Sequence, residues 1–204
     1  MNCDLFVFVL KVEELRFLDW NPISFNVNSG ECMGLYGCSG SGKTLLFRAI
    51  ADLDPNQGKV LINGKRREDF SGSVWRKKVG YLPAESSWWF PKVSQHFSSI
   101  EDAKLRYLGF LDIKIFDSEV SRLSSGEKQR LALARLLSGL PEVLLLDEPT
   151  ANLDDSNACL VETLIKNYCK KQGAAAIWVT HDRSQLERVS QNQLVMKNKT
   201  LVDL

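Results

Sequence analysis

The stretch Gly37-Cys38-Ser39-Gly40-Ser41-Gly42-Lys43-Thr44 decides the fold of this chain. It matches the pattern G-x-x-x-x-G-K-[ST], in which consecutive backbone N–H groups form a nest around the phosphates of a nucleotide. Glycines allow that backbone path, and the positive end of the following helix dipole points at the phosphates. We therefore expect Lys43 to reach the β and γ phosphate oxygens, and the Thr44 hydroxyl to bind a magnesium ion.

The residues on either side of this loop supply the strand–turn–helix context that the motif requires. Cys32–Tyr36 is a short apolar run typical of a buried strand, and the segment from Leu45 to Ala51 continues as a helix without a breaker. The alternative is a Gly/Ser turn that binds nothing. The surrounding pattern argues against that alternative.

The bulk composition fits one large domain with balanced charge. The 204 residues include 26 Lys and Arg against 25 Asp and Glu, so the net charge of +1 points to no nucleic-acid partner. Five cysteines without C-x-x-C spacing suggest neither a disulfide framework nor a zinc site. We expect reduced cytosolic thiols.

The sequence predicts no targeting or membrane-spanning segment. The apolar run 5–10 lacks a basic region before it and a cleavage site after it, so we interpret 5–12 as a strand. No run approaches the roughly 18 apolar residues of a membrane span. We expect the protein itself to be soluble.

Strands alternate with helices along most of the chain, which predicts an α/β fold with a mainly parallel central sheet. Early strands separated by tight turns predict an antiparallel β subdomain. Further strands are expected at 23–27, 59–62, 79–82, 143–146 and 174–180, and a further helix at 156–170. We interpret residues 1–204 as one domain, with a helical lobe at 86–122 inserted between core segments 1–85 and 123–204.

Two carboxylates follow the apolar run Val143–Leu146, which is typical of a strand buried on both faces. Asp147, at the end of this strand, is expected to support the magnesium ion. Glu148 is expected beside the γ-phosphate, where it would orient or deprotonate an attacking water. The alternative is a solvated acidic turn before Pro149, which the presence of the phosphate loop disfavours.

The segment Leu123-Ser124-Ser125-Gly126-Glu127 precedes a helix that ends at Gly139. Ser124 and Glu127 form a capping box, which explains both residues without any ligand. A helix N-terminus also presents backbone N–H groups and a positive dipole to a phosphate. These two interpretations are compatible.

The order of these motifs resembles the ATP-binding-cassette (ABC) transporter ATPases, which are P-loop NTPases. The resemblance rests on the phosphate loop, Leu123–Glu127, Asp147-Glu148, Ala151-Asn152-Leu153-Asp154 and His181, and it covers nearly the whole chain. It implies that ATP and Mg²⁺ are bound. It also implies that a second copy of the chain pairs head to tail with the first, so that ATP lies between the two.

The resemblance assigns roles to individual residues. The ATP-binding set is Gly37, Cys38, Ser39, Gly40, Ser41, Gly42, Lys43, Thr44 and Leu45. The metal-site residues are Thr44 and Asp147, and the catalytic residues are Lys43, the base Glu148, and His181, which contacts the γ-phosphate. The residues that act on the partner's nucleotide are Ser124, Ser125, Gly126 and Glu127. Asp154 couples the two sites. For adenine stacking we expect Phe17 first and Trp20 second, the alternative being that both pack in the core.

Two departures from the family pattern are visible. Ala84 stands where a glutamine that contacts magnesium is expected, and Glu85 follows it. We hypothesise that Thr44, Asp147 and water hold the ion, with Glu85 as an occasional outer partner. Ser125 and Glu127 replace a usual glycine and glutamine.

The resemblance also implies a separate integral membrane permease as partner. Such a partner would dock near Trp88, Trp89 and Phe90, because three consecutive aromatic residues in a loop are typical of contact sites. The alternative is that two of these rings pack against the helical lobe. The chain is then expected to be cytoplasmic and peripheral on the inner face of the cell membrane. The alternatives are a soluble cassette ATPase acting on DNA or ribosomes, and a small-molecule kinase. The sequence predicts no nucleic-acid partner.

Overall fold

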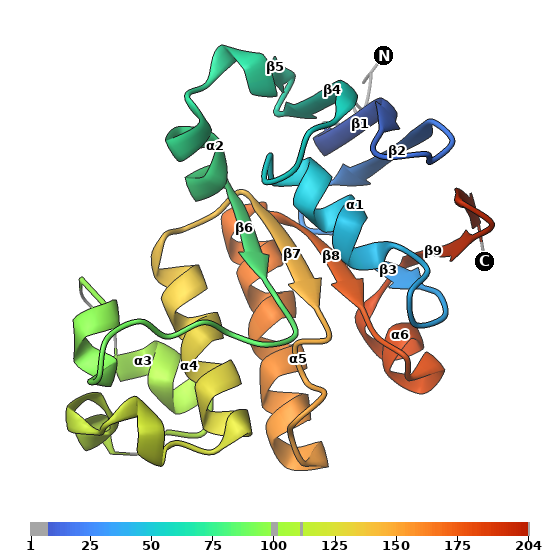
Figure 1. The fold of residues 1–204 in the computed structure, drawn as a ribbon. Coiled ribbons are helices and arrows are strands. Elements are labelled where there is room, and N and C mark those ends of the chain that lie inside the picture. Colours follow the sequence, from blue (N-terminus) through green and yellow to red (C-terminus); the bar gives the residue numbers. More distant parts are fainter. Residues whose placement is uncertain (1–7, 99–101, 111, 204) are drawn as a thin grey trace, which may run out of the picture.

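The structure, a computed structural model, describes residues 8–98, 102–110 and 112–203. Its larger sheet has six strands, and Figure 1 shows helices on both faces of it. In spatial order the strands are β10 (Thr200–Asp203), β9 (Asn192–Lys197), β3 (Cys32–Tyr36), β8 (Ala175–Val179), β7 (Val143–Asp147) and β6 (Val79–Leu82). All neighbouring pairs are parallel except β10 and β9. The prediction of a mainly parallel sheet is confirmed.

The two central strands, β7 and β8, are apolar along their whole length because both of their faces are covered. Along β7, Val143 and Leu145 face the core that contains α1, whereas Leu144 and Leu146 face the core that contains α4 and α5. This alternation is the two-residue repeat of a strand. Packing on both faces fixes the position of the carboxyl ends of β7 and β8 next to α1.

The smaller sheet is antiparallel, as predicted. Its spatial order is β2 (Ile23–Asn28), β1 (Phe8–Arg16), β4 (Gln57–Ile62) and β5 (Lys65–Arg66). Asn63 and Gly64 both have positive φ, which is the geometry of the tight turn that joins β4 to β5. Of the strand expected at 5–12, residues 5–7 lie outside the described residues, and β1 continues to Arg16.

The helices are α1 (Lys43–Ile50), α2 (Gly72–Lys78), α3 (Asp102–Tyr107), α4 (Ser125–Ser138), α5 (Asp155–Gln172) and α6 (Arg183–Val189). Our sequence interpretation omitted α2, α6, β5, β9 and β10. Both helices have only seven residues, and α2 buries Trp75 alone, so neither carries a strong 3.6-residue pattern. In segment 86–122 the described elements are α3 and 3₁₀ turns at Val93–His96, Ile113–Asp117 and Val120–Arg122.

Arg130 of α4 connects this segment to the core. Its guanidinium donates to the Leu108 carbonyl at 2.5 Å and to Asn157 Oδ1 at 2.7 Å, and it lies 4.5 Å from the Phe110 ring centroid. Arg130 therefore joins the chain after α3 to α5.

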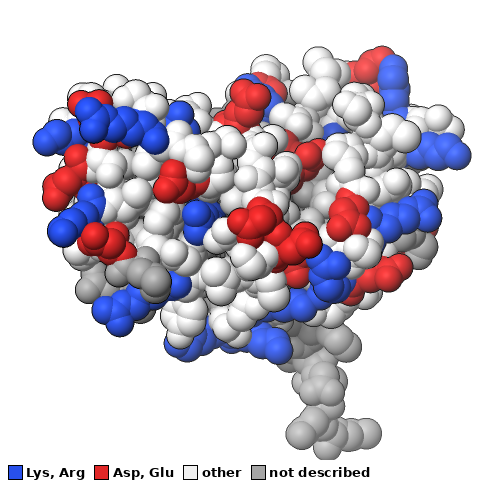
Figure 2. All heavy atoms as spheres, turned by 90° about the horizontal axis from the view of Figure 1, so that it is seen from below, with Lys and Arg blue, Asp and Glu red and all other residues white. Residues whose placement is uncertain are grey.

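Charges of both signs are distributed over the surface. Figure 2 shows acidic and basic side chains mixed across one face of the molecule. This mixture agrees with the net charge of +1.

Candidate nucleotide-binding site

The loop between β3 and α1 has the backbone path that its glycines predict. Gly40 and Gly42 have φ of 73° and 93°, in the left-handed region that favours glycine. A Cβ atom on Gly42 would lie 2.3 Å from the ring of Trp20, and one on Gly37 would lie 2.9 Å from the Met196 carbonyl oxygen. Gly42 therefore needs glycine for both space and conformation, whereas Gly40 needs it for conformation and Gly37 for space.

Lys43 begins α1 and folds back over the loop. Its side chain is buried, and Nζ donates to the Gly37 carbonyl at 2.7 Å and to the Cys38 carbonyl at 2.9 Å. Burial lowers the pKa of Lys43, although the charges of Glu148 and Asp147 act in the opposite direction. The ammonium group is thus already held at the loop that phosphates would enter.

Thr44 and Asp147 meet beside this loop. The Thr44 hydroxyl donates to Asp147 Oδ2 at 2.7 Å, and Asp147 is buried at the end of β7. Tyr81 of β6 lies close by: burial and the charge of Asp147 raise the pKa of Tyr81 to about 12. A hydroxyl and a carboxylate are hard oxygen donors of the kind that Mg²⁺ prefers.

Glu148 and His181 come from neighbouring strand ends. The Glu148 N–H donates to the Val179 carbonyl at 3.1 Å, and Glu148 has φ of 49°. His181 follows the end of β8, and its Nε2 atom lies 2.5 Å from Glu148 Oε1. A cavity of about 300 Å³ collects these groups; its lining residues are Ser39, Gly40, Ser41, Gly42, Lys43, Thr44, Leu45, Ala84, Asp147, Glu148 and His181. Gly37 and Cys38 contribute through the carbonyl groups that hold Lys43.

Ala84 lines this cavity, whereas Glu85 is exposed and does not. The nearby carboxamide of Gln129 donates to the Pro83 carbonyl at 3.1 Å. Where the family pattern has a glutamine, the cavity is therefore lined by the methyl group of Ala84.

The helix α4 begins with the predicted capping box. Ser124 Oγ accepts from the Glu127 N–H at 3.2 Å, and Glu127 Oε2 accepts from the Ser124 N–H at 2.9 Å. Ser124 and Ser125 are exposed, and Gly126 packs so closely that an added Cβ would lie 2.8 Å from the Asn152 carbonyl oxygen. Residues 124–127 do not line the phosphate-loop cavity of their own chain.

Asp154 caps the start of α5. Its carboxylate accepts from Ser156 Oγ at 2.6 Å and from the Asn157 N–H at 2.9 Å. These hydrogen bonds, led by that from Ser156, hold the pKa of Asp154 well below its usual range. Asp154 is also exposed and lies outside the cavity.

Phe17 and Trp20, the two candidates for adenine stacking, differ in their burial. Phe17 is 3% exposed, and its ring stacks on Trp20 with centroids 5.3 Å apart. Trp20 is only partly buried and lies against Gly42. A core position leaves no ring face for a ligand, so the second choice, Trp20, has the better geometry.

The aromatic loop, residues 88–90, has one half-buried and two exposed side chains. Trp88 packs edge-on against His96, while Trp89 is 63% and Phe90 45% exposed. His96 Nε2 accepts from the backbone N–H groups of Trp89 and Phe90 at 3.1 and 3.0 Å. The exposed rings are therefore presented by a fixed turn.

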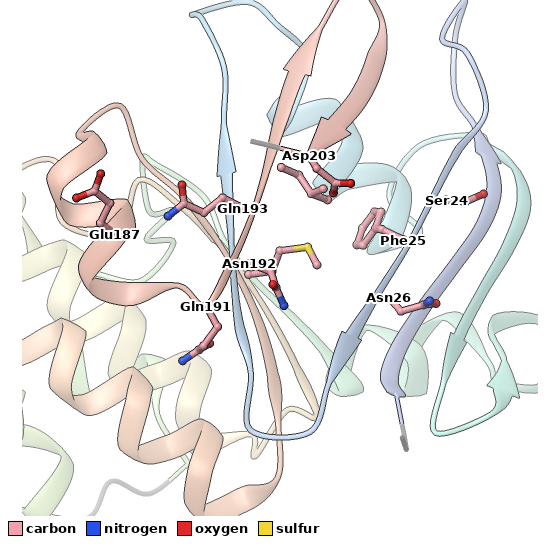
Figure 3. A pocket seen from close by; sticks show the side chains of 10 residues that line it. Ser24, Phe25, Asn26, Glu187, Gln191, Asn192, Gln193 and Asp203 are labelled. Carbon is pink, nitrogen blue, oxygen red and sulfur yellow. The ribbon is translucent and has the colours of Figure 1, made fainter. Parts of the chain in front are cut away.

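A larger cavity, of about 690 Å³, lies between β2, β9, β10 and α6 (Figure 3). Several of its polar side chains already have partners: Ser24 Oγ accepts from the Glu14 N–H, and Gln191 Oε1 accepts from the Cys32 N–H. Asn192 donates to Glu31. In Figure 3 the labelled side chains point in different directions, so they do not converge on one ligand.

The phosphate loop at the carboxyl edge of a parallel sheet, with Asp147 and Glu148 facing it, defines a P-loop nucleotide-hydrolase fold. Residues 20–151 match the ABC transporter family. The chain belongs to this family. Among the described residues, no helix is long and apolar enough to cross a membrane.

Known proteins agree with this assignment. The chain is 33% identical, over 178 residues, to the probable iron export ATP-binding protein FetA of Escherichia coli K12, covering 81% of this chain and 79% of that protein. CbiO1 of Clostridium perfringens, part of the transporter complex cbiONQ, is 26% identical with a TM-score of 0.78, covering 96% and 87% of the two chains.

Two further solved structures share the fold. A bacterial Atm1-family ABC exporter with ATP bound has a TM-score of 0.84 at 22% identity; the match covers 95% of this chain and 38% of that one. The ATP-binding cassette MJ0796, a dimer bound to ADP and Pi, has a TM-score of 0.79 at 21% identity, covering 96% and 98%.

Proposed function

We propose that this chain binds and hydrolyses ATP to power a membrane transporter whose permease is a separate chain. The observation that carries the proposal is the cavity that gathers Lys43, Thr44, Asp147, Glu148 and His181 at the carboxyl edge of the sheet. A phosphate loop without the carboxylates would bind a nucleotide but lack a base. Membership of the ABC transporter family supports the coupling to transport.

The loop holds the triphosphate. Its backbone N–H groups surround the phosphates, and Lys43 moves from the Gly37 and Cys38 carbonyls to the β and γ oxygens. Thr44 and Asp147, whose oxygens are 2.7 Å apart, would hold Mg²⁺. When bound, the ion would neutralise part of the negative charge of the phosphates.

Glu148 acts as the base that takes a proton from the attacking water. Its contact with His181, at 2.5 Å, supports this role because the imidazole fixes the direction of the carboxylate. His181 also lines the cavity, within which the γ-phosphate would lie.

A second copy completes the site. The exposed tip of α4, with Ser124, Ser125, Gly126 and Glu127, would reach the nucleotide of the other copy and supply N–H donors. Asp154, whose neighbours Asn152 and Leu153 pack on Gly126, would couple the two sites.

The permease docks near Trp88, Trp89 and Phe90, which places the chain on the cytoplasmic face of the membrane. The exposure of Trp89 and Phe90 on a turn fixed by His96 supports this choice. The mixed charges in Figure 2 give no support to a nucleic-acid partner on that face.

The test of the function is Glu148→Gln. We expect hydrolysis to fall by at least about 100-fold, because the amide cannot accept the proton. ATP binding should survive, and gel filtration with ATP should then detect a dimer. The matched control is Glu119→Gln, which changes an exposed glutamate paired with Arg122 and should hydrolyse ATP at the parental rate. Parental hydrolysis by Glu148→Gln would show that Glu148 is not the base.

A further inference from the structure

A buried polar network joins the turn after Glu148 to two helices. Thr150 is buried in that turn, Glu162 is buried on α5, and Gln185 is buried on α6. All three are described residues, and none of them lines the nucleotide cavity. Polar groups that are buried together are costly to leave unpaired, so their hydrogen bonds fix the elements that they join. We call these residues the polar network.

Gln185 uses both polar atoms of its carboxamide in the polar network. Its Nε2 donates to the Thr150 hydroxyl at 2.8 Å and to Glu162 Oε1 at 2.9 Å, and its Oε1 accepts from the Thr150 hydroxyl at 3.2 Å. Arg188, on the same helix, donates to the two oxygens of Glu162 at 3.0 and 3.3 Å and so compensates the buried carboxylate. Gln185 is therefore the residue that links the turn to both helices.

The polar network lies behind the two segments that carry the base and its histidine. Glu148 precedes Thr150 by two residues, and His181 precedes Gln185 by four. The Glu148 N–H donates to the Val179 carbonyl at 3.1 Å, which ties the strand ends. Beyond this bond both segments leave the sheet. The His181 side chain is 49% exposed, so its position relative to Glu148 depends on how the backbone around it is held.

We propose that Gln185 is a positioning residue for hydrolysis, because it fixes the turn after Glu148 against the helix after His181 and so keeps these two side chains in contact. This inference rests on the proposed function, in which Glu148 is the base. Without the bonds of Gln185 the two segments can move independently. A displacement of about 1 Å at the reacting groups can lower a rate about 100-fold, so a modest shift is enough to slow the reaction.

Two variants of Thr150 in the full chain test the proposal. Thr150→Val keeps the shape of the side chain and removes the hydroxyl that Gln185 binds, whereas Thr150→Ser keeps that hydroxyl. We expect kcat for ATP hydrolysis to fall at least about tenfold in Thr150→Val and to recover most of its parental value in Thr150→Ser. The KM for ATP should change little in either variant, because Thr150 lies outside the nucleotide cavity.

A double-mutant cycle with His181→Ala distinguishes positioning from a general loss of stability. In the parental chain His181→Ala removes the contact with Glu148. In the Thr150→Val background, and likewise in Gln185→Leu, that contact is already displaced. The fold loss in kcat caused by His181→Ala should therefore be at least about threefold smaller in both backgrounds than in the parental chain.

Tyr168→Phe is the matched control. It removes a buried hydrogen bond made by the same helix as Glu162, from the Tyr168 hydroxyl to the Pro141 carbonyl at 2.8 Å, and Tyr168 does not line the cavity. Tyr168→Phe should unfold at a lower urea concentration than the parental chain but keep the parental kcat. Circular dichroism checks that each variant is folded. The conservative pair at Thr150 keeps the test decisive if Gln185→Leu does not fold.

The outcomes separate this inference from the proposed function. A parental kcat in Thr150→Val, or equal losses in Thr150→Val and Thr150→Ser, would overturn the role of Gln185 alone. An undiminished cost of His181→Ala in the variant backgrounds, or a fall in kcat in Tyr168→Phe as large as that in Thr150→Val, would do the same. A parental chain that does not hydrolyse ATP would overturn the proposed function and this inference together.

Discussion

Ala84 gives the nucleotide cavity a methyl group where related proteins are expected to have an amide. The proposed ion ligands of the cavity, Thr44 and Asp147, are hydrogen-bonded to each other, and Asp147 is buried. Glu85 is exposed and outside the cavity, so it does not take the place of the missing amide. Our hypothesis of Glu85 as an outer partner then requires the loop to shift.

At the residue scale we predict that Ala84→Gln changes turnover more than ATP affinity. The new amide would face Asp147 and Glu148, where it would help to position the attacking water. Turnover should rise about tenfold, equivalent to ~1.4 kcal/mol of activation free energy. Steady-state hydrolysis and equilibrium nucleotide binding measure the two quantities. The control, Glu85→Gln, should alter neither, and a large gain in affinity at constant turnover would contradict the idea.

At the scale of the element, the start of α4 is fixed by a loop from another part of the chain. Gly126 lies against the backbone of Asn152, in the turn that follows β7 and precedes α5. The capping box sets the helix end, and this contact sets its position relative to Glu148 and Asp154. We therefore expect a change at the helix tip to affect the turn that follows Glu148.

We predict that Gly126→Ala destabilises the protein by about 1–3 kcal/mol, because a Cβ 2.8 Å from a carbonyl oxygen forces the backbones apart. The rate of ATP hydrolysis should fall together with the stability. Urea denaturation and ATPase assays measure the effects. Gly139→Ala, at the other end of the same helix, is the control: its Cβ would meet the Leu136 carbonyl oxygen at an ordinary 3.4 Å. Equal stability of the two variants would contradict the packing argument.

The sequence was sufficient for the elements that carry strong local signals. The buried run of β7, the Asn63-Gly64 turn and the Ser124 capping box each have a local pattern that predicts one backbone structure, and each forms as predicted. The short helices α2 and α6 have little apolar periodicity, and they form because tertiary contacts hold them. The sequence also could not rank the two candidate adenine rings: proximity in sequence does not say that Phe17 lies in the core while Trp20 is only partly buried.

At the scale of the whole molecule, stability depends on pH through carboxylates whose pKa is lowered in the folded state. Hydrogen bonds or ion pairs lower the pKa of Glu13, Asp19, Asp54, Glu68, Asp154 and Asp182. Because the pKa is lower in the folded state, the carboxylates of the unfolded chain bind protons at a higher pH than those of the folded protein. The stabilisation is therefore complete above the unfolded pKa, near 4, and is lost as the pH falls toward the folded pKa.

We predict that the free energy of unfolding falls between pH 5 and the acid limit, and that Asp154→Asn makes this fall shallower. The asparagine keeps a cap for α5 but has no charge to protonate. Urea denaturation at a series of pH values gives the two curves. They should be furthest apart at neutral pH and converge in acid; parallel curves would contradict the assignment to Asp154.

The position of Lys43 has a consequence for how tightly ATP is held. Because its ammonium group is hydrogen-bonded to the Gly37 and Cys38 carbonyls before any ligand arrives, an incoming triphosphate replaces existing bonds rather than meeting a bare cation. The binding constant therefore reports the difference in free energy between two arrangements in which Lys43 is hydrogen-bonded, one to the carbonyls and one to the phosphates. We expect such an exchange to make ATP binding weaker than it would be if Lys43 lacked these hydrogen bonds.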